Sequence, residues 1–197
     1  MYKRKDYFYK KAKEEGFRSR AAYKLIEIQK KYKIFKKGDY VLDLGCAPGG
    51  WIQVVLKFIG KDGRIKGIDL LDVKPFKEEN VEIIKGDIYE YNFENEKFDV
   101  IISDMAPNTS GIKHADYYRS FELCEYAFKI AQNCLKNNGN LVMKIFQGKE
   151  FNELRGVLKK NFKEVSVFKP KSSRSSSVET YIVCKGKSLW LNLVICF

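Results

Sequence analysis

From residue 38 onwards, short apolar runs alternate along the chain with longer amphipathic stretches. The apolar runs are rich in Val, Ile, Leu and Phe, as buried strands are, and the amphipathic stretches repeat their apolar positions with helical spacing. The predicted strands lie at residues 40–44, 64–70, 81–88, 98–105 and 140–146, and the predicted helices at residues 51–59, 115–135 and 151–161. This alternation favours a doubly wound α/β fold with a mostly parallel sheet and helices on both of its faces.

Two further strands are predicted at residues 164–169 and 179–186, which would make the sheet seven-stranded. Only residues 170–178 connect these strands, whereas a crossover between parallel strands needs a dozen residues or more. We therefore expect an antiparallel hairpin, so that the sheet carries an antiparallel strand at the C-terminal end of the chain.

The N-terminal part of the chain is predicted to be helical. Ser19 is a residue type favoured as a helix N-cap, and the pattern after it predicts a helix that runs to about Phe35. The apolar stripe of this helix consists of Ala22, Leu25, Ile26 and Tyr32. A shorter basic helix is expected around residues 7–15, with Gly16 as its stop.

The chain of 197 residues, of which 45% are hydrophobic, is long enough for one sizeable core, so we expect a single domain over residues 1–197. Residues 1–37 are predicted to form a basic helical segment, residues 38–187 the core, and residues 188–197 a hydrophobic tail. The tail is too short to cross a bilayer; it could add an edge strand, contact a partner or be a sequence artefact. With no secretory signal recognised at the N-terminus, we expect a cytoplasmic monomer without membrane contacts.

Positive charge is concentrated at the two ends of the chain, within a formal net charge of +12. Residues 1–37 hold 14 Lys or Arg against 4 Asp or Glu, residues 163–187 hold 6 against 2, and the remainder is slightly acidic. A charged surface that served only solubility would spread its charge more evenly. This segregation is typical of a surface for a polyanion, and nucleic acid is the predicted partner.

Cysteine and histidine usage limits the chemistry. The five cysteines are odd in number, scattered and never spaced as CxxC, so neither a disulfide framework nor a zinc site is indicated. His114 is the single histidine, which argues against a histidine-based triad or metal cluster. We expect no metal, and proton transfer would fall to Lys, Asp, Glu or Tyr.

Lys144 is unusual for its position. It stands inside the apolar run NLVMKIFQ at residues 140–147, which otherwise reads as a strand buried on both faces. A lysine removed from water is rare and tends to mark function. The alternative is that the strand ends near Lys144 and that its stem carries the ammonium out to water.

The run DLGCAPGGW opens the first strand-to-helix turn. Gly45, Ala47 and Gly50 take the spacing of the dinucleotide fingerprint GxGxxG, but alanine replaces the middle glycine. That change disfavours a pyrophosphate and favours a nucleoside without phosphates, such as S-adenosylmethionine; the alternative is an ordinary tight turn. Trp51, directly after the loop, could flank this cofactor or belong to the core.

Three aspartates follow at the ends of successive predicted strands, where doubly wound sheets bind their ligands. Asp69 could accept hydrogen bonds from ribose hydroxyls and Asp87 one from an adenine amino group. Asp104 ends the next strand, in DMAPNTSG. Any one of them could be a turn or cap residue, but all three together favour a cofactor site.

Five motifs along the chain resemble those of the heat-shock FtsJ/RrmJ (RlmE) family of ribosomal RNA 2′-O-methyltransferases. They are SRAAYKL, DLGCAPGGW, DMAPNTSG, MKIFQG and KPKSSRSSSVETYIV, and the resemblance covers residues 17–186. It implies the Rossmann-like fold of class I S-adenosylmethionine-dependent methyltransferases. Two departures are small: Cys46 replaces an alanine frequent in the family, and the tail after Lys187 extends past the usual end.

The resemblance also implies roles for individual residues. The Lys-Asp-Lys-Glu catalytic tetrad of the family falls on Lys24, Asp104, Lys144 and Glu179, with Lys144 as the proton acceptor. The contacts with S-adenosylmethionine fall on Gly49, Trp51, Asp69, Asp87 and Asp104. The fingerprint spacing adds the loop glycines Gly45 and Gly50 to the predicted cofactor site. The implied substrate is a uridine of large-subunit ribosomal RNA in the assembled subunit.

Other functions are open at this point. A transfer RNA or messenger RNA cap could be the substrate of the same ribose methylation. A non-catalytic RNA-binding factor for ribosome assembly is a second alternative, although the complete tetrad argues against it. A dinucleotide dehydrogenase is disfavoured by Ala47 and by the lack of residues suited to hydride transfer.

The chemistry of ribose methylation explains why a lysine would be needed. The enzyme must align a 2′-hydroxyl with a methyl group on a good leaving group and help to remove the hydroxyl proton. A lysine removes a proton only when it is neutral. Lys24 and the positive cofactor favour the neutral form of Lys144, whereas Asp104 and Glu179 favour the charged form. Lys144 is therefore either a general base, which we favour, or a group that orients the hydroxyl.

Overall fold

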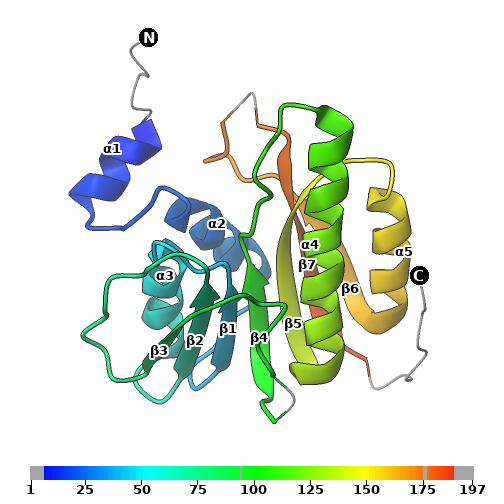
Figure 1. Cartoon of the computed structure of the whole chain (residues 1–197). Coiled ribbons are helices and arrows are strands. Elements are labelled where there is room, and N and C mark those ends of the chain that lie inside the picture. Colours follow the sequence, from blue (N-terminus) through cyan, green and yellow to red (C-terminus); the bar gives the residue numbers. More distant parts are fainter. Residues whose placement is uncertain (1–6, 94, 175–176, 189–197) are drawn as a thin grey trace.

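The computed structural model describes residues 7–93, 95–174 and 177–188 (Figure 1). Its centre is a sheet of seven strands, as predicted from the sequence. The strands are β1 (Tyr40–Leu44), β2 (Arg64–Asp69), β3 (Val81–Lys85), β4 (Phe98–Ser103), β5 (Leu135–Phe146), β6 (Phe162–Phe168) and β7 (Glu179–Lys187). Their order across the sheet is β3-β2-β1-β4-β5-β7-β6.

The direction of the strands also agrees with the prediction. Strands β3, β2, β1, β4 and β5 pair in parallel, and β7 pairs antiparallel with both β5 and β6. Strand β7, which comes last among the described strands, is thus inserted between β5 and β6. Because β7 runs against β5, the start of β7 lies beside the end of β5, where Phe146 pairs with Glu179.

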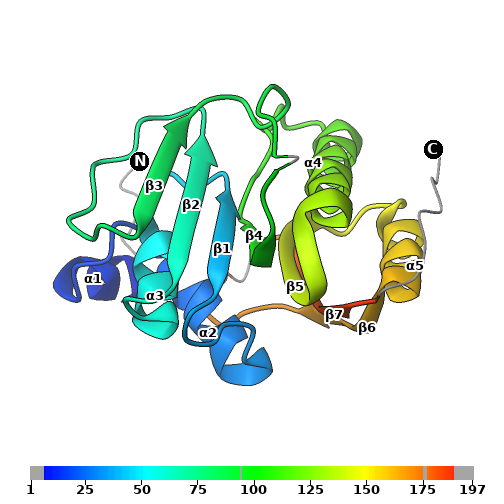
Figure 2. The same cartoon turned by 90° about the horizontal axis from the view of Figure 1, so that it is seen from below.

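Helices cover both faces of the sheet, which is the predicted doubly wound arrangement. The helices are α1 (Tyr7–Glu14), α2 (Ala22–Tyr32), α3 (Gly50–Ile59), α4 (Lys113–Cys134) and α5 (Phe151–Asn161). One core cluster packs α4 and α5 on the sheet, and a second packs α1, α2 and α3 on its other face. Figure 2 shows α2 and α3 on the opposite side of the sheet from α4.

The predicted N-terminal helix is shorter than expected. It begins at Ala22 and ends at Tyr32, and no side chain caps its N-terminus, so the assignment of Ser19 as the N-cap was wrong. The helix stops because Lys33 is left-handed, with φ of 51°, and donates its N–H to the carbonyl of Gln29. Ser19 instead lies against the start of α3, as described below.

Two predicted strand boundaries were also wrong. Strand β3 ends at Lys85, so Asp87 follows the strand by two residues instead of ending it. Strand β5 begins at Leu135 instead of at the predicted residue 140. The pairing of β4 with β5 changes register beside this segment, between Phe98 and Val100, which accommodates the extra residues.

The hydrophobic tail lies largely outside the described residues, which end at Ser188. Within the described residues, no helix is long and apolar enough to cross a bilayer.

Candidate active site

Lys144 lies in the interior of the sheet, on β5, with Tyr181 of β7 directly opposite it. Its side chain is 7% exposed, so the alternative in which the ammonium reaches bulk water was wrong. The backbone around it is held by α4: the thiol of Cys124 donates to the carbonyl of Lys144 over 3.0 Å, and Ser120 Oγ accepts the N–H of Phe146 over 3.1 Å. The lysine therefore stands on a rigid strand.

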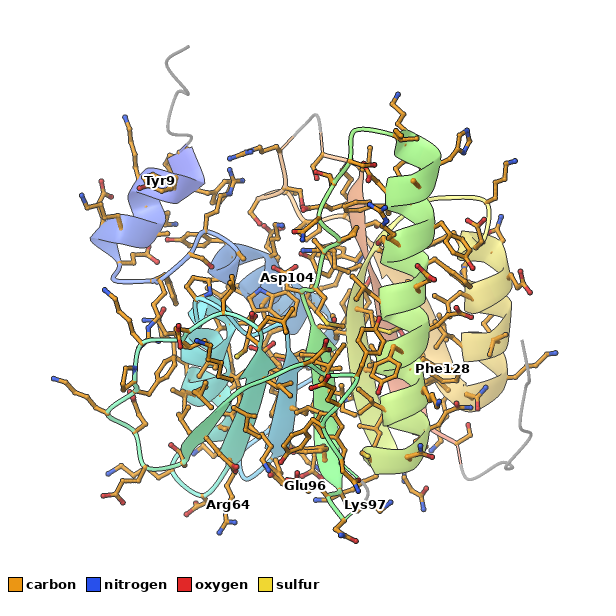
Figure 3. The ribbon with its side chains drawn as sticks, viewed as in Figure 1. Tyr9, Arg64, Glu96, Lys97, Asp104 and Phe128 are labelled. Atoms are coloured by element: carbon orange, nitrogen blue, oxygen red, sulfur yellow. The ribbon has the colours of Figure 1, made fainter. Side chains whose placement is uncertain are left out.

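Asp104 is the direct partner of this lysine. Lys144 Nζ donates to the backbone carbonyl of Asp104 over 2.5 Å and lies 3.2 Å from its carboxylate Oδ1. Asp104 follows β4 at the end of the sheet that carries the glycine-rich loop, whereas Glu96 and Lys97 mark the opposite end (Figure 3). The pair thus occupies the edge at which doubly wound sheets bind ligands.

Lys24 and Glu179 form a second ion pair beside the first. Lys24 Nζ of α2 donates to Glu179 Oε2 over 2.8 Å, and the side chains are 11% and 25% exposed. Burial alone would raise the pKa of Glu179, but the charges of Lys24 and Lys144 hold that pKa below its ordinary value. All four residues of the predicted tetrad are therefore brought to one place by α2, β4, β5 and β7.

The Lys24–Glu179 pair should make stability depend on pH. A carboxyl group whose pKa is lower in the folded state stabilises the fold above its unfolded pKa, about 4.3 for glutamate, and this contribution is lost as the pH falls through the folded pKa. We expect Glu179→Gln to reduce the free energy of unfolding by about 1 to 3 kcal/mol at pH 7. The difference from wild type should shrink below pH 4 in urea unfolding; a difference that stays constant would contradict the pairing.

Tyr181 is a fifth member of the cluster that the sequence analysis missed. Its hydroxyl donates to Asp104 Oδ1 over 2.7 Å, and its ring is fully buried, 5.9 Å from Lys24 Nζ. Burial, followed by the charge of Asp104, raises the pKa of Tyr181 well above its ordinary value, so that the hydroxyl stays a donor. The available signal was its position two residues after Glu179, on the same face of a strand.

The glycine-rich loop needs its glycines. Gly45 and Gly49 have φ of 76° and 101°, a region that favours glycine. A Cβ on Gly45 would stand 2.5 Å from Met105 Cγ, and one on Gly50 would stand 2.4 Å from Ser19 Oγ. The loop is therefore packed on one side by the segment after β4 and on the other by the N-terminal segment.

Asp69 and Asp87, two of the three predicted cofactor aspartates, lie at and just after the ends of the neighbouring strands β2 and β3. Asp69 accepts the backbone N–H of Ala47 and that of Leu71, both over 2.8 Å, which fixes its carboxylate at the end of β2. Asp87 accepts the N–H of Tyr89 over 3.0 Å, so it also shapes a turn. Each carboxylate retains acceptor capacity for hydroxyl or amino groups of a nucleoside.

Trp51 lies in the core instead of on the surface. It is 3% exposed, its indole N–H donates to the carbonyl of Ala21 over 2.9 Å, and its ring lies 5.8 Å from that of Tyr181. The structure therefore places Trp51 between the N-terminal segment and Tyr181 of the cluster.

Asp43 is a second residue that the sequence analysis missed. It lies on β1 just before the glycine-rich loop, it is fully buried, and both of its carboxylate oxygens lack a hydrogen-bond partner in the structure. Burial, with the charges of Asp104 and Asp69, raises its pKa well above the ordinary value. Buried carboxyl groups normally have a hydrogen-bond partner. A carboxyl group without one, directly before the glycine-rich loop, fits a loop that binds a polar or cationic ligand.

Metal ligands do not cluster in the part of the chain that the structure describes: no three His, Cys, Asp or Glu side chains there are placed to hold a metal ion.

Two basic parts of the chain meet beside the cluster. The loop at residues 169–174 is fastened to α2, since Glu27 accepts the backbone N–H groups of Lys171 and Ser172 over 2.7 and 2.9 Å. Arg20 in turn donates to the carbonyl of Ser172. The two positively charged ends of the chain, which are remote in sequence, are thus joined next to Lys24 and Glu179.

Known proteins resemble this chain over most of its length. Residues 17–187 match the sequence model of a family described as FtsJ-like methyltransferase. The chain is 46% identical over 190 residues to ribosomal RNA large subunit methyltransferase E of Methanobrevibacter smithii, covering 93% of this chain and 90% of that protein. It is 44% identical to the protein of the same name from Methanococcus aeolicus, covering 94% and 71%.

Solved structures show the same fold. A crystal structure of a ribosomal RNA methyltransferase from Plasmodium falciparum superimposes with a TM-score of 0.76 at 35% identity, covering 87% of this chain and 98% of that one. An rRNA methylase from Clostridium thermocellum superimposes with a TM-score of 0.55 at 19% identity, covering 82% and 96%, which supports the fold alone.

Proposed function

The chain belongs to the FtsJ-like methyltransferase family, and from that membership we propose that it is an S-adenosylmethionine-dependent RNA ribose 2′-O-methyltransferase. The proposed substrate is a uridine of large-subunit, 23S-type ribosomal RNA, in keeping with the names of the relatives. The observation that carries the proposal is the buried ammonium of Lys144, held against Asp104 at the ligand-binding end of the sheet.

Lys144 in its neutral form would accept the proton of the 2′-hydroxyl. Asp104 fixes the position of the nitrogen through its backbone carbonyl and its carboxylate. Lys24 lies at the other side of the cluster, where its ammonium pairs with a carboxylate. Glu179 holds Lys24 in place, and Tyr181 orients the carboxylate of Asp104. These residues therefore position one base and keep the other charges paired.

The cofactor, when bound, supplies a methyl group on a sulfonium. We propose that the residues that hold it are Gly45, Gly49, Gly50, Trp51, Asp69, Asp87 and Asp104. Asp69 and Asp87 would accept hydrogen bonds from its ribose and adenine, and the glycines let its chain approach the backbone. Trp51 is buried, so it would support the glycine-rich loop from the core side. A sulfonium needs no Lewis acid to make it reactive, so we propose that no metal is required.

The basic ends of the chain would bind the RNA backbone. Residues 1–37 and 163–187 hold all of the excess positive charge. The contacts of Glu27 bring α2 and the 169–174 loop together beside the proposed catalytic cluster. An assembled ribosomal subunit in the cytoplasm is the proposed target, and the enzyme is proposed to act as a monomer. Transfer RNA or a messenger RNA cap is the alternative substrate of the same chemistry.

Mapping of ribose methyl groups tests this proposal. Mass spectrometry of ribosomal and transfer RNA should reveal one 2′-O-methyluridine in large-subunit RNA that is lost when the gene is deleted and restored by the wild-type protein, but not by Lys144→Ala. Loss of a methyl group from transfer RNA alone would support the alternative substrate. Unchanged methylation in both RNAs would favour an RNA-binding assembly factor.

Asp69→Ala should weaken cofactor binding. We expect the dissociation constant of S-adenosylhomocysteine, measured by calorimetry, to rise by about 5- to 150-fold, since a charged acceptor contributes about 1 to 3 kcal/mol. Asp72→Ala is the matched control, because Asp72 is an exposed carboxylate of the same loop that pairs with Lys85. Equal affinities for wild type and Asp69→Ala would remove Asp69 from the proposed cofactor site.

A further inference from the structure

The segment between α1 and α2, residues 16–21, docks onto the start of α3. The backbone N–H of Arg18 donates to Gln53 Oε1 over 2.7 Å, and Gln53 Nε2 donates to the carbonyl of Gly16 over 2.9 Å. The indole of Trp51 binds the carbonyl of Ala21 at the other end of the segment. This docking segment connects the basic N-terminal helix to the helix that carries Lys24.

The side chain of Arg18 joins this segment to two loops that frame the proposed cofactor site. Its Nη1 donates to the carbonyls of Pro48, over 3.3 Å, and Lys74, over 2.6 Å, and its Nη2 donates to that of Pro75 over 2.9 Å. Its guanidinium also stacks on the ring of Phe76, 3.7 Å from the ring centroid. Pro48 belongs to the glycine-rich loop, and the other three belong to the loop after β2.

The fit of Arg18 and Phe76 over Gly49 is close. A Cβ on Gly49 would stand 2.8 Å from Phe76 Cζ and 2.9 Å from Arg18 Nη1. The glycine-rich loop is therefore covered by these two side chains, and a side chain at Gly49 would displace them. The shape of the loop and the position of Arg18 depend on each other.

We propose that Arg18 is a positioning residue for the cofactor: it holds the glycine-rich loop and the loop after β2 in the arrangement that binds S-adenosylmethionine. The inference rests on the proposed function. It assigns the arginine to the cofactor side of the enzyme, although it lies in a basic segment that we propose to bind RNA. Its guanidinium donates three hydrogen bonds to backbone carbonyls and stacks with one face on a ring, so few of its N–H donors remain for a phosphate.

The planar guanidinium is essential to this role. Two of its nitrogens reach three carbonyls in fixed directions while its face lies on an aromatic ring. A lysine has one nitrogen on a flexible stem and cannot reproduce both contacts. Arg18→Lys, which keeps the charge, should therefore behave almost like Arg18→Gln, which loses it.

Calorimetric titration with S-adenosylhomocysteine tests the inference. We expect both Arg18→Lys and Arg18→Gln to bind at least 10-fold more weakly than wild type. Lys61→Gln is the matched control, because Lys61 is exposed and lines the same surface pocket as Arg18 and Phe76; it should bind normally. In steady-state kinetics, Arg18→Lys should raise the KM for S-adenosylmethionine while kcat and the KM for RNA stay near wild type, a split that general loss of structure would not produce.

A second pair of substitutions separates cofactor binding from RNA binding. Lys10 and Lys13 are exposed on α1, so Lys10→Gln with Lys13→Gln should weaken binding of an unmodified large-subunit rRNA transcript and leave the affinity for S-adenosylhomocysteine unchanged. Arg18→Lys should do the reverse. If Arg18→Lys instead weakened only the binding of RNA, Arg18 would be an RNA contact and the inference would be wrong.

The remaining outcomes are also decisive. If wild-type protein did not bind S-adenosylhomocysteine, the proposed function itself would fail. If wild type bound it and Arg18→Lys bound it equally well, only the inference would fail. Should Arg18→Lys not fold, Phe76→Leu removes the stacked ring from the opposite side of the same contact; it should weaken cofactor binding severalfold, and normal binding by this variant would overturn the inference.

Discussion

Replacing Lys144 by alanine is expected to lower the rate of methyl transfer by at least about 10²- to 10⁴-fold, the range typical of general-base removal. The fold and both binding steps should remain close to normal. The strand that carries Lys144 is held by backbone contacts from Cys124 and Ser120, which the substitution leaves in place. The loss should therefore appear in single-turnover rates and not in the affinities for S-adenosylhomocysteine or RNA.

Arginine should not restore the activity. A guanidinium keeps the positive charge, but it stays protonated at any working pH and cannot accept the hydroxyl proton. Lys136→Ala is a suitable control for the loss of a lysine charge, because Lys136 pairs with Asp99 at the opposite end of the sheet. It should transfer methyl groups at nearly the wild-type rate.

The pH dependence separates a base from an orienting group. If Lys144 is the base, the wild-type rate should rise with pH as the lysine loses its proton, and the residual activity of Lys144→Ala should lack this rise. An orienting lysine would give a flatter profile and partial activity for Lys144→Arg. Normal turnover by Lys144→Ala would remove the catalytic assignment and leave the fold and family untouched.

Much of the fold could be predicted because its signals are local. Each parallel strand is a short apolar run, and the loop between the last two strands is too short for a crossover. The position of Asp104 followed from the same logic, since residues after parallel strands meet at one edge of the sheet. The antiparallel insertion of β7, which sets Tyr181 opposite Lys144, depends on strand order and could not be predicted from local pattern.

The parts that could not be predicted depend on contacts between remote segments. Ser19 has the residue type of an N-cap, yet it packs on Gly50, because docking of the N-terminal segment onto α3 outweighs the local capping preference. Asp43 was read as part of a strand, and only its burial without partners marks it as unusual. Arg18 was counted among the basic residues for RNA, whereas its acceptors lie 30 to 57 residues away in sequence.

Asp104, which follows β4, contacts residues of two other strands, β5 and β7. Its carboxylate Oδ1 accepts the hydroxyl of Tyr181 over 2.7 Å and lies 3.2 Å from Lys144 Nζ, and its backbone carbonyl accepts a further bond from Lys144. Asp104→Ala would leave the fully buried hydroxyl of Tyr181 without an acceptor and give Lys144 freedom to move. We expect the rate of methyl transfer to fall by about 10²-fold or more, because a misplacement of the reacting groups by about 1 Å can cost that much. The free energy of unfolding should fall by about 1 to 3 kcal/mol, because a buried hydroxyl loses its acceptor.

Asp104→Asn distinguishes the charge of this carboxylate from its hydrogen bonds. The amide oxygen can still accept the Tyr181 hydroxyl, so the fold should be retained, but the negative charge that pairs with Lys144 is gone. If the ion pair positions Lys144, Asp104→Asn should transfer methyl groups more slowly than wild type while its free energy of unfolding stays close to the wild-type value. Wild-type rates for Asp104→Asn would mean that the charge of Asp104 is not needed, and a fully active Asp104→Ala would show that this contact does not position the base.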